Sequence, residues 1–245
     1  MSNRRKKLSE EEEQQVLESI MTAPTNGTLT KVKVELKAKN PNQKLFASYI
    51  EDKEIVICSG PAGTGKTYVA CAQALKLFKN DQRYKKIYIV KSVTTLKDEE
   101  IGFLKGTLDE KMEPYIYSFI HNFEKIVGRS ITKTLRDNGS IEVMPIAFLR
   151  GINFDDCIVL IDECQNITHD NMRTIMTRIG TNCKMIFLGD TGQIDLKMKK
   201  NSSLPMIMEK FSKIEEFGCI ALSDDDIVRN PLIKKIEQVF NELQS

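Results

Sequence analysis

The sequence predicts an α/β fold in which helices flank a mostly parallel sheet, and two observations carry this prediction. The first is a set of six short runs rich in β-branched and apolar residues, at 54–59, 86–92, 140–145, 157–163, 183–190 and 218–223. Several runs are apolar nearly throughout, as expected of strands buried on both faces. The second is a set of helical patterns between and after these runs, at 65–79, 108–127, 169–179 and 232–243. Such alternation is typical of a doubly wound sheet.

The pattern predicts one domain, over residues 31–245, because that range has no internal repeat and no low-complexity linker. Residues 1–30 are expected to form a peripheral segment. Within it, Ser9 and Glu12 make a capping box for a short helix. The stretch TAPTNGT then ends this helix.

The composition is that of a soluble globular protein, with 41% hydrophobic and 29% charged residues among 245. The chain has no long apolar run, so we expect neither a membrane span nor a signal peptide. Six cysteines without C-x-x-C spacing are expected to be small buried residues of a cytoplasmic protein rather than zinc ligands. The net charge of +2 does not by itself indicate a nucleic-acid binder.

The stretch GPAGTGKT, residues 60–67, follows the first apolar run and opens the first helix. It matches G-x-x-x-x-G-K-[ST], in which glycines let backbone N–H groups surround phosphate oxygens at a helix N-terminus. Lys66 is expected to reach the β- and γ-phosphates, and Thr67 to ligate Mg²⁺. ATP and Mg²⁺ are therefore the expected ligands. The predicted nucleotide-binding residues here are Gly60, Pro61, Ala62, Gly63, Thr64, Gly65, Lys66, Thr67 and Tyr68.

Two later apolar runs end in polar residues that suit the same site. In CIVLIDECQN the apolar run ends in Asp162, a candidate Mg²⁺ ligand, and Glu163, which can orient or deprotonate an attacking water. GDTGQID places Asp190 and Gln193 after the next run, at the sheet edge where ligands bind in such folds. A glutamine there can sense the γ-phosphate, although a polar turn after a strand is an equally simple interpretation.

The order of these motifs resembles the PhoH family, the phosphate-starvation-inducible-protein-like ATPases of bacteria and many bacteriophages. The resemblance covers roughly residues 40–240. It rests on GPAGTGKT, GFLKGTLDEKMEPY (102–115), IEVMPIAFLRG (141–151), LIDECQN (160–166), TRIG (177–180), GDTGQID (189–195) and DIVRNPLI (226–233). The family's core is similar to the first RecA-like domain of superfamily one helicases, a P-loop NTPase.

The resemblance assigns further roles. Lys66 and Thr67 match the P-loop pair, Asp162 and Glu163 match motif II, and Gln165 and Gln193 match the glutamines of motifs II and III. Gln43 looks like the upstream glutamine that reads adenine in related helicases. This chain departs from the family at Val90-Lys91-Ser92, where many bacterial members carry T-R-P. Longer members add a PIN-type nuclease domain, for which the residues before this core leave no room, so ribonuclease activity is not expected.

A single core of this kind needs an arginine to neutralise charge on the γ-phosphate, an effect of roughly 10³–10⁵ in rate. Arg178 in TRIG is a candidate for acting in trans, and Arg229 in DIVRNPL for acting in cis or in trans. Arg150 is a third candidate that could serve nucleic acid instead. A head-to-tail ring would complete every site equally, so we expect a hexamer.

Single-stranded RNA or DNA is the expected polymer, with expected contacts from Lys91, Phe103, Lys105 and Arg150. Solvated surface lysines and a packed Phe103 explain the same residues equally well. A nucleic-acid helicase or translocase is therefore the leading hypothesis. An ATP-dependent switch or assembly module acting on a protein partner is the alternative, and a kinase ranks lowest. If the gene is carried by a phage, the expected location is the host cytoplasm.

Overall fold

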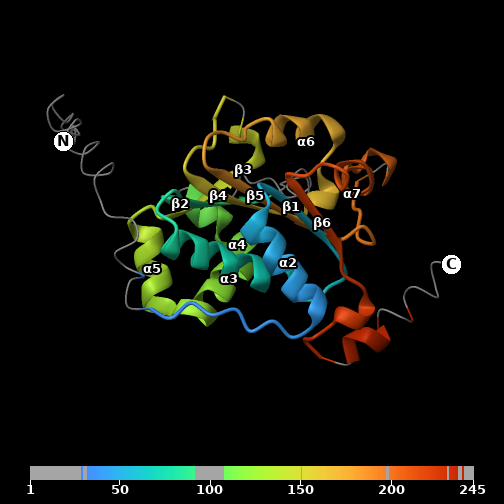
Figure 1. Ribbon diagram of the computed structural model, residues 1–245, viewed down its shortest axis with the longest axis horizontal. Coiled ribbons are helices and arrows are strands. Elements are labelled where there is room, and N and C mark those ends of the chain that lie inside the picture. The colour runs from blue at the N-terminus through green and yellow to red at the C-terminus, as the bar shows by residue number, and fades with distance from the viewer. Residues whose placement is uncertain are drawn as a thin grey trace, which may run out of the picture.

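The computed structural model describes residues 29, 32–91, 108–149, 151–196, 199–230, 232–236 and 239 (Figure 1). Three predicted nucleic-acid contacts, Phe103, Lys105 and Arg150, lie outside this range. The helix expected after Ser9 also lies outside it.

Six strands form one sheet, and every pairing among them is parallel. The strand order is β3-β2-β4-β5-β1-β6. The strands are β1 (Ile55–Ser59), β2 (Lys86–Lys91), β3 (Ile141–Pro145), β4 (Cys157–Asp162), β5 (Cys183–Gly189) and β6 (Phe217–Ala221). All six predicted strands are confirmed.

Three helices lie where the sequence predicts them: α3 (Lys66–Asn80), α4 (Leu108–Val127) and α6 (His169–Met176). Three others were not predicted: α2 (Pro41–Asp52), α5 (Arg129–Asp137) and α7 (Leu204–Phe211). Four short 3₁₀ turns complete the described elements: η4 (Ile146–Leu149), η5 (Cys164–Asn166), η6 (Lys199–Asn201) and η7 (Asp224–Asp226). None of the helices in the described ranges has the length and apolarity needed to cross a membrane.

The helices cover both faces of the sheet and bury two cores. α2, α3, α4 and α5 lie on one face, and α6 and α7 lie on the other (Figure 1). β4 illustrates the consequence, because Ile158 and Leu160 enter the first core while Val159 and Ile161 enter the second. A strand buried on both faces has no solvated positions, which explains its continuous apolar sequence.

Parallel pairing brings the carboxyl ends of four strands to one edge of the sheet. Ser59 at the end of β1 is in register with Gly189 of β5, and Lys91 of β2 with Asp162 of β4. The P-loop follows Ser59, so the residues at this edge can surround one ligand.

Candidate nucleotide-binding site

The P-loop between β1 and α3 requires its glycines. A Cβ on Gly60 would lie 2.7 Å from the Cβ of Leu222, which is too close for any side chain. Gly63 and Gly65 have φ angles of +83° and +84°, in the left-handed region that favours glycine. The loop can therefore wrap tightly before α3 begins at Lys66.

Segments from before and after the P-loop hold it in place. The buried Gln43 side chain donates from Nε2 to the Thr64 carbonyl (2.8 Å) and accepts at Oε1 from the Lys39 N–H (2.7 Å). On the other side, the Val228 N–H donates to the Gly63 carbonyl (3.0 Å). Gln43 thus links the loop backbone to the segment before α2 through the two ends of its amide, and its predicted reading of adenine stays a prediction.

The Lys66 ammonium lies over the loop and donates to the carbonyls of Gly60 and of Pro61, the latter at 2.9 Å. Lys66 and Thr67 are the first residues of α3, so both lie at the positive end of the helix dipole. This is the position at which helices bind phosphate.

Asp162 pairs with a lysine rather than standing alone at the end of β4. Lys91 Nζ lies 3.0 Å from Asp162 Oδ2, and the two side chains are only 17% and 12% exposed. Register explains the contact, because Lys91 and Asp162 are partners across the β2–β4 pair. Lys91, a predicted nucleic-acid contact, therefore lies in the same cavity as Lys66 and Asp162.

A hydrogen-bonded chain connects β4 to β5 through Gln165. Its Nε2 donates to Glu163 Oε2 (2.7 Å), and its Oε1 accepts from the Asp190 N–H (3.0 Å). Glu163 has a left-handed backbone, with φ of 52°, which is uncommon for a residue with a side chain. The buried Gln165 thus fixes the Glu163 carboxylate relative to the GDTGQID segment, where the Gln193 N–H donates to the Asp190 carbonyl (3.1 Å).

These elements enclose a cavity of about 710 Å³. Its lining includes the predicted residues Gln43, Ala62, Gly63, Gly65, Lys66, Thr67, Tyr68, Lys91, Asp162, Glu163, Asp190, Gln193 and Arg229. Six lysine or arginine side chains line it against three carboxylates, so the cavity favours a polyanion. The Thr67 hydroxyl and the Asp162 carboxylate are hard oxygen donors of the kind that Mg²⁺ prefers, so they fit that metal.

Some lining residues were not predicted from the sequence. Ser118, Asn122 and Lys125 come from α4, and Lys37 and Lys39 from the segment before α2. The sequence predicts that residues 118, 122 and 125 share one face of a helix, because they recur at helical spacing. Only the packing of α4 against the site tells which face that is.

Of the three arginine candidates, the two that the structure describes lie in different places. Arg229 lines the cavity, beside Gly63. Arg178 follows α6 at the opposite edge of the sheet, where its carbonyl accepts from the N–H of Phe154, a residue that precedes β4. The six residues of β4 separate the two edges by roughly 20 Å at about 3.3 Å per residue, so Arg178 cannot reach the cavity of its own chain.

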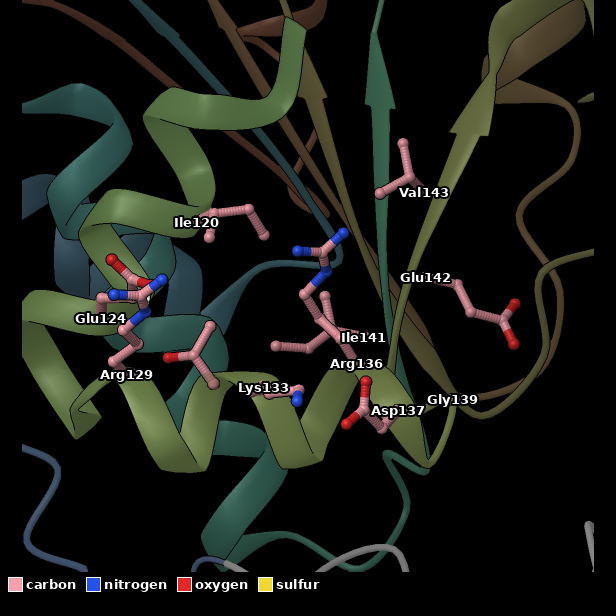
Figure 2. Close-up of a pocket in the computed structure, with 11 residues that line it drawn as sticks. Ile120, Glu124, Arg129, Lys133, Arg136, Asp137, Gly139, Ile141, Glu142 and Val143 are labelled. Atoms are coloured by element: carbon pink, nitrogen blue, oxygen red, sulfur yellow. Dashed lines mark ion pairs between the residues drawn. The ribbon is translucent and has the colours of Figure 1, made fainter. Parts of the chain in front are cut away.

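A second hollow, of about 800 Å³, lies between α4, α5 and the β3 edge of the sheet. Figure 2 shows Arg129 beside Glu124 at one end, with Nε and Oε1 3.9 Å apart. At the other end, Glu142 points away from Arg136 and pairs with Lys86 (2.7 Å). Its basic and acidic lining residues are balanced, so this hollow lacks the excess of cations that marks the first cavity.

The buried thiols of Cys58 and Cys164, beside the site, stay protonated near neutral pH. Burial raises the pKa of the Cys58 thiol, next to Ser59 in β1, to about 12. Burial also raises the pKa of Cys164, which follows Glu163. A protonated thiol is a weak nucleophile, so the groups of the site that can react are its carboxylates and cations.

The sequence matches the family described as PhoH-like protein over residues 35–241. A PhoH-like protein of Bacillus subtilis is 35% identical over 84% of this chain and 64% of its own length. Protein PhoH of Escherichia coli is 32% identical over 83% of this chain and 58% of its own length. The chain thus spans about three-fifths of the length of these relatives.

Two solved structures are similar to part of this chain. The large terminase of a thermophilic bacteriophage, in complex with ADP, has a TM-score of 0.44 at 13% identity, over 81% of this chain and 49% of the terminase. The Hef helicase domain of Pyrococcus furiosus has a TM-score of 0.42 at 14% identity, over 73% of this chain and 37% of that domain. On the extent of the family match and the identity of its relatives, the chain belongs to the PhoH family.

Proposed function

We propose that this protein binds ATP with Mg²⁺ and hydrolyses it, and that a ring of copies uses the hydrolysis to move along single-stranded RNA or DNA. The observation that carries the ATP part is the cavity at the carboxyl edge of the sheet, where six cations face three carboxylates around a glycine loop. Backbone N–H groups of the loop and Lys66 are suited to the β- and γ-phosphates.

Thr67 and Asp162 would hold Mg²⁺, which supplies charge neutralisation at the phosphate oxygens when it is bound. Lys91 contacts the same Asp162 carboxylate that a metal would use, so the ammonium and the metal compete for it. Lys91 would then face the anion instead, as one of the cations of the cavity.

Glu163 is the residue we assign to orient the attacking water and to accept its proton. Its carboxylate lines the cavity, and Gln165 positions it through the 2.7 Å hydrogen bond. Because Gln165 also binds the Asp190 N–H, a change at Asp190 or Gln193 would reach the carboxylate that activates water.

The ring completes the set of charges. Arg229 is suited to the phosphates of its own chain, since it lines the same cavity. Arg178 lies at the other edge of the sheet and is suited to a neighbouring copy. Its Nε atom is buried without a hydrogen-bond partner among the described residues. A buried donor costs free energy unless an acceptor binds it, and a neighbouring copy could supply that acceptor. The nucleic-acid part rests on the family's motif order and on Phe103, Lys105 and Arg150.

An ATPase assay with and without single-stranded RNA and DNA tests this proposal. Glu163→Gln should retain ATP binding and lose turnover by at least about 100-fold, since the amide cannot accept a proton. Lys66→Ala should lose both ATP binding and turnover. Glu209→Gln, at an exposed position of α7, is the control and should behave like the parent.

Equal turnover by Glu163→Gln and the parent would refute the assignment of Glu163. Turnover stimulated by neither polymer, but by a protein, would select the alternative of a switch acting on a partner. Stimulation by a single strand that weakens steeply as salt rises would support the motor.

A further inference from the structure

An apolar groove of about 820 Å³ lies between α6 and α7, on the face of the sheet away from α2 and α3. Its apolar lining comes mainly from methionines and aromatic rings: Met172, Met176, Met206, Phe211 and Phe217. Met206 is 39% exposed, which is high for a large apolar side chain. Methionine-rich surfaces of this kind adapt to an apolar helix.

The chain carries a second apolar surface after β6. Leu232, Ile236 and Val239 are 58%, 45% and 55% exposed. Residues 232–236 and 239 are helical, and the spacing of four puts Leu232 and Ile236 on one helix face. An apolar stripe that faces solvent on a helix is typical of a segment that docks into a groove.

The two surfaces match each other in size and charge. At about 1.5 Å per residue, the helical stretch from Leu232 to Ile236 spans roughly 6 Å, which fits within the roughly 12 Å of the eight-residue helices that bound the groove. Glu54, Asp170 and Glu216 lie on the groove rim, against the single arginine Arg173. Lys235 lies beside these apolar residues, whereas its neighbour Lys234 pairs with Asp225 of its own chain.

The two surfaces cannot meet within one chain as it is folded here. Residues 232–236 lie on the α2 side of the sheet, whereas the groove lies on the α6 and α7 side (Figure 1). A contact between them therefore joins two copies head to tail, and it repeats from copy to copy.

We propose that the exposed apolar side chains of Leu232, Ile236 and Val239 of one copy dock into the α6–α7 groove of the next. This inference rests on the proposed ring. It also specifies the catalytic neighbour, because Ile233 lies beside Gly63 of the P-loop while Thr177 and Ile179 line the groove. Docking thus brings Arg178, which lies between those two residues, to the side of the neighbour's phosphate site.

Single charged substitutions test each surface. Ile236→Glu and Met206→Glu should each reduce the mass in solution, measured by light scattering with ATP and Mg²⁺, toward one chain of 27.9 kDa. Leu45→Glu on α2, where the leucine is 42% exposed, is the matched control and should assemble like the parent. Nucleotide binding by all three should equal that of the parent, which shows that each variant is folded.

Mixing the two variants is the sharper experiment. A Met206→Glu chain keeps its helix and an Ile236→Glu chain keeps its groove, so one contact forms between them. The mixture should give a species of two chains and nothing larger, because the remaining groove and helix are both blocked.

Three outcomes would overturn the inference. If both variants assemble like the parent, the ring stands and this interface is wrong. If the mixture stays at one chain while the parent assembles, the helix does not dock in the groove of another copy. If the parent itself stays at one chain but binds and hydrolyses ATP, the interface and the ring both fall while the ATPase proposal survives.

Discussion

Lys91 and Asp162 form the contact that says most about how single residues act in the site. The carboxylate that we propose as a metal ligand is held by an ammonium at 3.0 Å, with both side chains mostly buried. Such a pair satisfies Asp162 while no metal is bound, because a buried carboxylate without a partner is costly. The same contact makes metal binding a competition for one carboxylate.

Replacing Lys91 with methionine should therefore separate two effects. ATP binding without Mg²⁺ should weaken, since one of six cations is lost. The Mg²⁺ concentration needed for half-maximal nucleotide binding should fall by about tenfold, as expected for a partly buried charge pair worth about 1.4 kcal/mol. Titration calorimetry at several Mg²⁺ concentrations measures both.

Lys125→Met is the matched control for this experiment, because Lys125 lines the same cavity from α4. It should weaken ATP binding without lowering the Mg²⁺ requirement. An equal shift in the Mg²⁺ requirement for both variants would mean that Lys91 acts only as a general cation.

Among the secondary-structure elements, strands were predicted better than helices. The six strands are buried, so their apolar runs stand out, and turn residues separate them. α2 was missed although Asn40 caps it, with its side chain accepting from the Gln43 N–H at 2.7 Å, and Pro41 starts it. α5 and α7 are short, with nine and eight residues, and only tertiary packing distinguishes them from loops.

The same division holds for the site. Glycines and carboxylates at strand ends were predictable because parallel strands end at one edge. The α4 and Lys37–Lys39 contributions, the Lys91–Asp162 pair and the distance of Arg178 depend on which strands and helices are neighbours. The sequence pattern does not predict the strand order, in which β4 and β5 lie between β2 and β1.

Lys184 in β5 gives an element-scale prediction, since it is a buried lysine that donates to the carbonyls of Lys53 and Glu51 at the end of α2. Burial, with the nearby Arg83 charge, lowers the pKa of Lys184 to about 8 from 10.5. Between these values the unfolded chain binds a proton that the folded chain does not. The free energy of unfolding should therefore rise with pH across this window.

Lys184→Met removes this dependence. The difference in free energy of unfolding between parent and variant, from urea titrations, should change by about 2 kcal/mol in favour of the parent from pH 8 to pH 10. Lys210→Met, at an exposed position of α7, should show no such trend. A flat difference for Lys184→Met would mean that its ammonium is as well solvated as on the surface.

At the scale of the whole molecule, the two arginines divide between the edges of the sheet. Arg229 shares the cavity with Lys66, whereas Arg178 is a strand length away from it. If Arg178 acts as we propose, the set of phosphate cations is complete only where two copies meet.

Mixed assemblies of Arg178→Ala and Lys66→Ala chains should therefore recover ATPase activity that neither variant has alone. With equal amounts, about a quarter of parental activity is expected, since random assembly pairs an intact P-loop with an intact Arg178 at one contact in four. Arg229→Ala mixed with Lys66→Ala is the control and should show no recovery, because both residues serve the same cavity. Assembled mixtures of the first pair without recovery would contradict a role for Arg178 between chains.

The hydrogen bond from the Val228 N–H to the Gly63 carbonyl has a consequence for folding during synthesis on the ribosome. The glycine loop leaves the exit tunnel early together with Gln43, but Val228, which holds it from the other side, is made much later in translation. At about 5–20 residues per second, the delay is roughly 10 to 30 s. Throughout this interval Gln43 can hold the loop, but the contact from Val228 and the charge of Arg229 are missing. We therefore expect the nascent chain to bind nucleotide weakly until synthesis has passed β6.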